Sequence, residues 1–178
     1  MNEPLPHFRY HPDPVASGSI VARQVRCACC RQQRRFVYVG PVYATQDFTE
    51  KICPWCIASG AAARDLKAQF ADAESLASQD VPTEVIEEVV ARTPGYLSWQ
   101  GSEWLAHCKD ACAFLGDAAV EDVRSAAEST VSDWCATNRQ DRQGWLAATQ
   151  DYVPGGQPAF YKFQRLHCNN VRLGWDFH

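Results

Sequence analysis

Two pairs of cysteines are the residues whose types and spacing point most clearly to chemistry in this 178-residue chain. Each pair has the form C-x-x-C, with Cys27 and Cys30 in the first and Cys53 and Cys56 in the second. Two such pairs can supply the four sulfur ligands of a closed tetrahedral Zn²⁺ site, with Zn–S distances of ~2.3 Å. Unrelated buried free thiols would explain one C-x-x-C pair but not two such pairs on either side of one hairpin. The sequence therefore predicts one structural zinc ion at these four residues.

The segments around the two pairs predict the elements that position them. Two β-type runs lie between Cys30 and Cys53 and are interrupted at Gly40-Pro41, a pattern typical of a β-hairpin. An alanine-rich helical pattern follows Cys56 and is expected to continue to about Ala73. A knuckle, a hairpin and a helix in this order are typical of a treble clef. The metal site and the local fold then depend on each other, because the two cysteine pairs come together only if the hairpin folds back between them.

The segment Cys53-Pro54-Trp55-Cys56 has a second interpretation, as a thiol-redox motif. In such motifs a helix N-terminus lowers the pKa of the first thiol. That chemistry is expected in a βαβ context and needs no partner cysteines upstream. Here a predicted hairpin precedes the motif and another cysteine pair precedes the hairpin. Zinc binding is therefore favoured, and a redox protein using Cys53 and Cys56 is the alternative.

Composition predicts a reduced, cytoplasmic protein. The chain contains nine cysteines and its N-terminus has no basic and apolar signal pattern, so metal binding is expected rather than a disulfide framework. No run approaches the ~20 apolar residues that span a bilayer, so no membrane partner is expected. The length suits a single domain over 1–178. We expect a zinc-binding part at 20–73 and a helical part at 80–178 that closes with a β-hairpin.

Charge makes nucleic acid an unlikely partner. The formal net charge is −4, whereas nucleic-acid binding requires a Lys/Arg surface that displaces counterions. The basic cluster beside the first cysteine pair consists of Arg31, Arg34 and Arg35. We interpret it as a solvated turn whose charge offsets that of the thiolates. A nucleic-acid-binding zinc module acting through these arginines is a further alternative.

The remaining pattern predicts an α+β fold in which a treble-clef-like zinc module packs with helices and a C-terminal β-hairpin. Phe8 and Tyr10 indicate a proline-rich N-terminal arm pinned onto the domain. Further elements are predicted at these positions: a helix capped by Asp80 and closed at 93–95, a short helix from Ser102 to Cys108, a helix over 118–138, and a hairpin over 158–178 that turns at Asn169-Asn170.

Several motifs resemble the bacterial CbrC family, in order over nearly the whole chain. They are F-R-Y-H-P-D-P (8–14), C-A-C-C (27–30), G-P-V-Y (40–43), I-C-P-W-C-I-A (52–58), T-P-G-Y (93–96), W-Q (99–100), W-L-A-H-C-K-D-A-C-A-F-L-G (104–116) and L-H-C…G-W-D (166–176). The resemblance implies a cytoplasmic bacterial protein that binds zinc, in a family with one member linked to tolerance of a DNase colicin. It implies no catalytic residues.

A second metal site is suggested by the tail, with one departure from the family. The family's tail resembles C-x-H-C-G, but this chain has Arg165 for the first cysteine and Asn169 for the glycine. The residues left are Cys108, Cys112, Cys168 and His167, with His107 beside them. On a helix Cys108 and Cys112 would face one way. A Cys₃His site is chemically allowed, and so is a metal-free cluster of small buried side chains.

No catalytic constellation is visible, so we predict a protein without enzymatic activity. A Cys₄ site is closed, and the histidines show no H-E-x-x-H pattern. The leading hypothesis is an immunity or tolerance factor that binds and occludes a nuclease-type toxin. A basic toxin would be steered by acidic helix faces, for which the candidates are Glu84, Glu87, Glu88, Asp117, Glu121 and Asp122. The plainer interpretation is that these are solvated helix faces.

Overall fold

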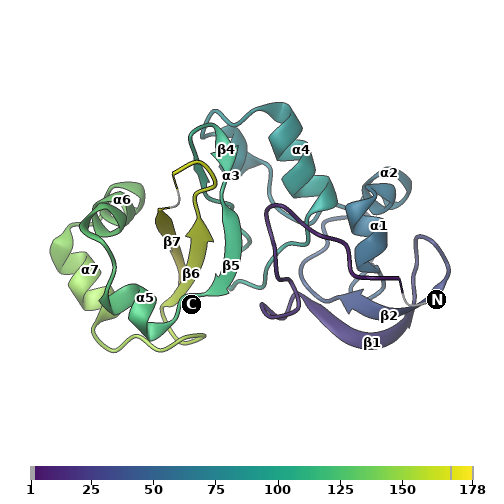
Figure 1. Ribbon diagram of the computed structural model, residues 1–178, viewed down its shortest axis with the longest axis horizontal. Coiled ribbons are helices and arrows are strands. Elements are labelled where there is room, and N and C mark those ends of the chain that lie inside the picture. The colour runs from purple at the N-terminus through teal and green to yellow at the C-terminus, as the bar shows by residue number, and fades with distance from the viewer. Residues whose placement is uncertain (1–2, 169, 178) are drawn as a thin grey trace.

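The computed structural model describes residues 3–168 and 170–177 and mixes α-helices with β-strands along the whole chain (Figure 1). The strands are β1 (Ile20–Arg26), β2 (Gln33–Tyr38), β3 (Ala106–His107), β4 (Asp110–Ala111), β5 (Ala113–Asp117), β6 (Ala159–Gln164) and β7 (Val171–Asp176). The helices are α1 (Pro54–Ala58), α2 (Ala61–Leu66), α3 (Glu74–Ala77), α4 (Thr83–Arg92), α5 (Val120–Arg124), α6 (Glu128–Asn138) and α7 (Arg142–Thr149).

The first hairpin has the cysteine knuckle as its own turn. Strands β1 and β2 pair antiparallel, and Arg26 opposite Gln33 is the last pair before the turn. The predicted hairpin after the knuckle, with its turn at Gly40-Pro41, is therefore wrong. The β-rich stretch before Cys27 takes the place of the second run. Between Gly40 and Cys53 the chain forms only isolated bridges, Tyr43 with Gln69 and Ile52 with Tyr38. The α+β class is confirmed, whereas a treble-clef arrangement is not established by this order.

The helical segment after the second cysteine pair is shorter than expected. Helix α1 begins at Pro54, whose fixed φ suits the first turn. Gly60 adopts a left-handed φ of 71°, which separates α1 from α2. Lys67, also left-handed, ends α2, so the single helix predicted to reach Ala73 is wrong. Helix α4 then begins after Pro82 rather than at an Asp80 cap.

A three-stranded antiparallel sheet, ordered β5-β6-β7, forms the middle of the molecule (Figure 1). The central strand β6 is buried on both faces: Tyr161 and Phe163 join one core cluster, while Phe160 joins another. Helices α5, α6 and α7 cover the Phe160 face. The predicted C-terminal hairpin is confirmed as β6-β7, closed by a 2.9 Å bond from the Arg165 amide to the Asn170 carbonyl. Asn169, in the predicted turn, lies outside the described residues.

Two helices predicted from the sequence take other forms. The segment from Ser102 to Cys108 contains no helix, and β3 and β4 form a tight hairpin through Cys108 and Lys109. Both turn residues have left-handed φ values, 54° and 56°, the pattern of a type I′ hairpin turn. The helix expected over 118–138 is divided into α5 and α6. Helix α7 was not predicted, although Asp141 caps it by accepting the Gly144 amide at 2.8 Å.

The N-terminal arm is pinned onto the domain, as expected. Phe8 is buried in the cluster around the cysteine knuckle, and Tyr10 is buried in the central cluster against the sheet. The Phe114 amide on β5 donates to the Tyr10 carbonyl at 2.8 Å. The arm therefore connects two core clusters that the rest of the chain builds from different elements. Over the described ranges, no helix combines the length and apolarity needed to cross a membrane.

Candidate metal centre

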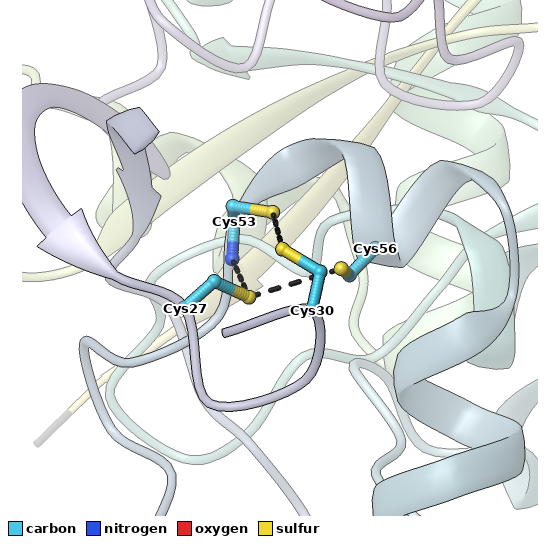
Figure 2. Close-up of side chains that lie close together, drawn as sticks. All are labelled: Cys27, Cys30, Cys53 and Cys56. Atoms are coloured by element: carbon cyan, nitrogen blue, oxygen red, sulfur yellow. Dashed lines mark hydrogen bonds between the residues drawn. The ribbon is translucent and has the colours of Figure 1, made fainter. Parts of the chain in front are cut away.

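The four predicted ligands converge from two elements. Cys27 and Cys30 lie in the turn of the β1-β2 hairpin, Cys53 is the N-cap residue of α1, and Cys56 lies in its first turn. Figure 2 shows the four thiols pointing toward one another. The hairpin is held beside the helix by backbone bonds, from the Ala28 amide to the Lys51 carbonyl at 2.8 Å and from the Tyr38 amide to the Ile52 carbonyl at 2.9 Å.

The sulfur geometry fits a tetrahedral metal site. All four Sγ atoms lie within 4.8 Å of one another. The Sγ–Sγ distance is 3.8 Å from Cys27 to Cys56 and 4.0 Å from Cys30 to Cys53. Four sulfurs placed ~2.3 Å from a central Zn²⁺ lie roughly 3.8 Å apart at the corners of a tetrahedron. The arrangement therefore needs little movement to hold a metal ion.

The surroundings of the cluster favour negative charge on sulfur. The contacts of Cys27 with Cys53 and Cys56 lower the pKa of the Cys27 thiol, which accepts the Cys53 amide at 3.4 Å. The same contact with Cys27 raises the pKa of Cys53, so the neighbouring thiols compete for negative charge when no metal is bound. A bound cation would remove this competition, because metal ligation deprotonates thiols outright.

Arg34 provides a nearby positive charge. Its guanidinium binds Glu3 at 2.6 Å and lies over the Trp55 ring at 4.9 Å. Glu3 first, and then the Cys30 sulfur, raise the pKa of Arg34 further above its ordinary value. Arg35 also contacts the arm, donating to the Glu3 carbonyl at 3.2 Å. Two of the three arginines considered for nucleic-acid binding are thus already engaged by the N-terminal arm.

The context of a thioredoxin-like redox motif is missing around Cys53 and Cys56. Every named strand pairing within the described part of the chain is antiparallel, so no βαβ unit precedes α1. Each of the two thiols lies against a sulfur of the upstream pair rather than being isolated with its neighbour. Cys29, which has no ligand role by spacing, is half-buried beside Cys56, and burial raises the pKa of its thiol.

The second predicted ligand set is not gathered in this way. Cys108 and Cys168 are exposed, and both lie near His107 Nδ1, at 3.0 Å and 3.8 Å. Cys112 is buried, and its amide donates to the Leu105 carbonyl. His167 Nε2 contacts Asp110 at 2.9 Å instead of a thiol. Among the residues that the structure describes, the Cys27, Cys30, Cys53 and Cys56 group is the only metal-competent cluster of three or more.

Two buried arginines explain part of this difference. Arg165 and Arg172 share the Asp133 carboxylate, at 3.3 Å and 2.6 Å. After the effect of burial, their charges are the next cause that lowers the pKa of His107. Positive charge beside the histidine opposes the binding of a second cation. Arg165, which stands where the tail motif of the resembled family has a cysteine, thus brings to this region a charge of the same sign as that of a metal ion.

The acidic residues that could bind a partner differ in their exposure and in whether other groups of the fold already contact them. Glu84 and Glu87 are exposed on α4, and Glu88 is half-buried beside Arg92 at 3.4 Å. Asp122 instead accepts the Ala119 amide at 2.9 Å and pairs with Lys162 at 2.6 Å, while Glu121 accepts the Ser125 hydroxyl at 3.1 Å. Asp117 is exposed, although partial burial of its carboxyl raises its pKa.

The fold and the cysteine cluster define an α+β protein with a metal-competent four-cysteine centre. The chain belongs to the uncharacterised protein family UPF0167, whose model matches residues 5–177. It is 43% identical to UPF0167 protein PA1536 of Pseudomonas aeruginosa over 178 residues, covering 99% of both chains. It is 55% identical to UPF0167 proteins Mb2317 of Mycobacterium bovis and MT2352 of Mycobacterium tuberculosis over 119 residues, which cover 67% of this chain and 64% of each relative. No solved structure matches the chain.

Proposed function

We propose that Cys27, Cys30, Cys53 and Cys56 bind one structural Zn²⁺ ion. The observation that carries this proposal is the convergence of four sulfurs within 4.8 Å from a hairpin turn and a helix start. An all-sulfur tetrahedral donor set suits zinc better than Mg²⁺ or Ca²⁺, which prefer oxygen ligands. Protein purified without added metal should contain about one equivalent of zinc. Replacement by Co²⁺ should give the spectrum of a tetrahedral thiolate site, and an octahedral spectrum would contradict the assignment.

The zinc ion in this proposal stabilises the fold and does not catalyse a reaction. Four thiolates fill a tetrahedral shell, whereas a catalytic zinc keeps one position for water or substrate. Metal bound here would connect the β1-β2 hairpin to α1 and so contribute to folding. We therefore propose a non-enzymatic protein, which acts in the cytoplasm. Turnover of a hydrolysable or redox substrate by the zinc-loaded protein would overturn this part of the proposal.

The partner we propose is a basic protein that α4 recognises through its acidic face. Glu84 and Glu87 are exposed there, so neither needs to be released from the fold before binding. Complementary charge speeds association and selects among partners. A nuclease-type toxin is a suitable basic partner, because its nucleic-acid site must be positively charged. That identity rests on the resemblance to a family with a colicin-tolerance member, and it makes the protein an immunity or tolerance factor.

Charge reversal on α4 tests this partner hypothesis. Glu84→Lys combined with Glu87→Lys should slow association with a nuclease toxin several-fold and leave stability nearly unchanged, since both positions are exposed. Asp151→Lys is the control, because Asp151 is exposed on a different surface. Protection of cells should rise in proportion to protein dose. Association that is insensitive to the α4 reversals and to salt would contradict the electrostatic mechanism.

The acids of the second candidate face require a different expectation. Reversing Asp122 would remove a helix cap and the ion pair with Lys162, so it should destabilise the protein itself by about 1 kcal/mol or more. A loss of protection after that substitution would not identify an interface. The α4 variants are therefore the informative ones.

A further inference from the structure

A cavity of about 280 Å³ lies at the end of the central sheet, away from the cysteine cluster. Strands β6 and β7 contribute Tyr161, Trp175 and Asp176 to its lining, the segment before β3 contributes Glu103, and the end of α6 contributes Asn138. Its walls thus combine aromatic rings with a few polar groups, which is the usual composition of small-molecule sites.

Asp176 is a buried carboxylate with one oxygen left without a partner. The residue is only 7% exposed. Its Oδ2 accepts three hydrogen bonds, from the Trp99 amide at 2.8 Å, the Gln100 amide at 3.2 Å and the Tyr161 hydroxyl at 3.3 Å. Its Oδ1 is buried and has no hydrogen-bond partner among the residues described. The carboxylate is therefore fixed in orientation by one oxygen and unsatisfied at the other.

The cavity provides no positive charge of its own. None of the described residues that line it is a lysine, arginine or histidine, and Glu103 adds a second carboxyl group. Asp176 also forms no ion pair within the described ranges, although the structure pairs several other acids. Burial and the Asp176 carboxylate raise the pKa of Tyr161 well above its ordinary value. A buried, unpaired carboxylate is costly, so a positive ligand here would be strongly favoured.

We propose that this cavity binds a small organic cation bearing an amine or guanidinium group, with Asp176 as its counter-ion. The N–H groups of such a ligand would satisfy the carboxylate, and the aromatic walls would contact the rest of the cation. The site is independent of zinc binding. The cation can belong to a free small molecule or to a lysine or arginine side chain presented by a protein, and the second case would add an anchor point to the proposed basic partner.

Binding of matched cationic and neutral probes to the full zinc-loaded chain tests the proposal. Methylguanidinium is compared with N-methylurea, which has a similar shape and no charge. The readout is the NMR shift of the Gly174 and Trp175 amides and of the Trp175 indole N–H, which donates to Asn138 at 2.8 Å. We expect saturable shifts with methylguanidinium and binding of N-methylurea weaker by roughly tenfold or more. Equal binding of the two probes, or no shift with either, would overturn the proposal.

A substitution pair locates the counter-ion. Asp176→Asn keeps an oxygen that can accept the Trp99 and Gln100 amides, and it should weaken methylguanidinium binding by roughly tenfold or more. Asp151→Asn makes the same charge change on an exposed residue and should leave binding unchanged. If Asp176→Asn does not fold, Glu103→Gln removes the second carboxylate, at the exposed edge of the cavity. This substitution should also weaken methylguanidinium binding, but to a lesser degree. Unaltered binding in a folded Asp176→Asn protein would show that the carboxylate has no role.

Peptides distinguish the two sources of the cation. Acetyl-Gly-Arg-Gly-amide is compared with its citrulline analogue, which replaces guanidinium with a neutral urea group. Binding of both methylguanidinium and the arginine peptide supports a site that protein side chains can enter. Binding of methylguanidinium alone supports a free small molecule and leaves the proposed basic partner unaffected. If the cation proposal fails, the proposals for zinc and for α4 still stand, because their experiments measure metal content and association with a toxin.

Discussion

The cysteine cluster at the first hairpin and the cysteine–histidine group around His107 use the same ligand types with opposite results. At the first, four sulfurs from two elements lie within 4.8 Å of one another. At the second, two exposed thiols lie near one imidazole, while the third thiol is buried and His167 contacts a carboxylate. Ligand identity is therefore insufficient. What matters is whether the backbone brings the ligands to one point.

The charges around the two groups reinforce this difference. Near the first cluster, Arg34 lies outside the ring of sulfurs and is already paired with Glu3. Near the second, Arg165 and Arg172 are buried and share one carboxylate. The region around His107 and Cys112 therefore already contains two buried positive charges, which oppose a metal ion. Four experiments test the difference between the two groups.

The largest effect is expected from removing one ligand of the first cluster. Cys53→Ser should abolish tight zinc binding and destabilise the β1-β2 hairpin and α1 by several kcal/mol, because binding at such a site is part of the folding free energy. Metal analysis and hydrogen exchange of residues 20–66 would measure this. Cys29→Ser, at a thiol beside the cluster that is not a ligand, is the matched control. Full zinc content in Cys53→Ser would remove the assignment.

Thiol labelling should separate the two groups by reactivity. Cys108 and Cys168 are exposed and should react first with iodoacetamide. Burial raises the pKa of Cys112 to about 12, which reduces its thiolate fraction on the order of a thousandfold relative to an ordinary thiol. Cys112 should therefore stay unlabelled. The first cluster should be protected until a chelator removes zinc. Early labelling of Cys27 or Cys56 in the zinc-loaded protein would contradict a closed site.

A buried histidine provides a pH-dependent contrast to the exposed His167. His11 contacts the Pro94 carbonyl and the Ser17 hydroxyl, and burial lowers its pKa to about 4. The unfolded chain would bind the proton near pH 6.5, so stability should fall as pH decreases from about 6.5 to about 4, by on the order of 3 kcal/mol. The fall should level off below the folded pKa.

The measurement for His11 is urea unfolding of wild type and His11→Asn at matched pH values. Any loss of bound metal in acid should affect both proteins equally, so the difference between them isolates the histidine. The stability gap should narrow as pH decreases from 7 to 4.5, because the asparagine does not titrate. A gap that is independent of pH would contradict this, because it would show that the pKa of His11 is the same in the folded and unfolded states.

The smallest effect is expected at Arg165. Arg165→Cys should strengthen metal binding at the second group by roughly tenfold or more, since it removes a like charge and adds a thiolate. Arg165→Ala removes only the charge and should recover part of this gain. Competition with chromogenic chelators would measure both. If the wild-type protein already holds two equivalents of equal affinity, the contrast between the two groups is wrong.

The sequence predicted the four cysteines of the first cluster because the spacing within each pair is short and local. A C-x-x-C pair closes within one turn, and Pro54 places the second pair at a helix start whatever the rest of the chain does. The burial of Phe8 and Tyr10 and the C-terminal hairpin were also predicted from alternation of apolar residues. These are periodic or adjacent patterns, and they require little tertiary information.

Tertiary structure alone decided the partners of elements whose local preference is weak. The segment Ile20–Arg26 became the partner strand of β2, which moved the hairpin turn from Gly40 to the cysteine knuckle. Cys108 and Lys109 adopt left-handed φ values in the turn that pairs β3 with β4, and this hairpin stands where a helix was predicted. The contacts of Asp176 with the Trp99 and Gln100 amides likewise join β7 to a segment far away in the sequence. Local spacing therefore predicts which residues can bind a metal. Long-range strand pairing controls which of them meet, because pairing energy depends on neighbours far away in the chain.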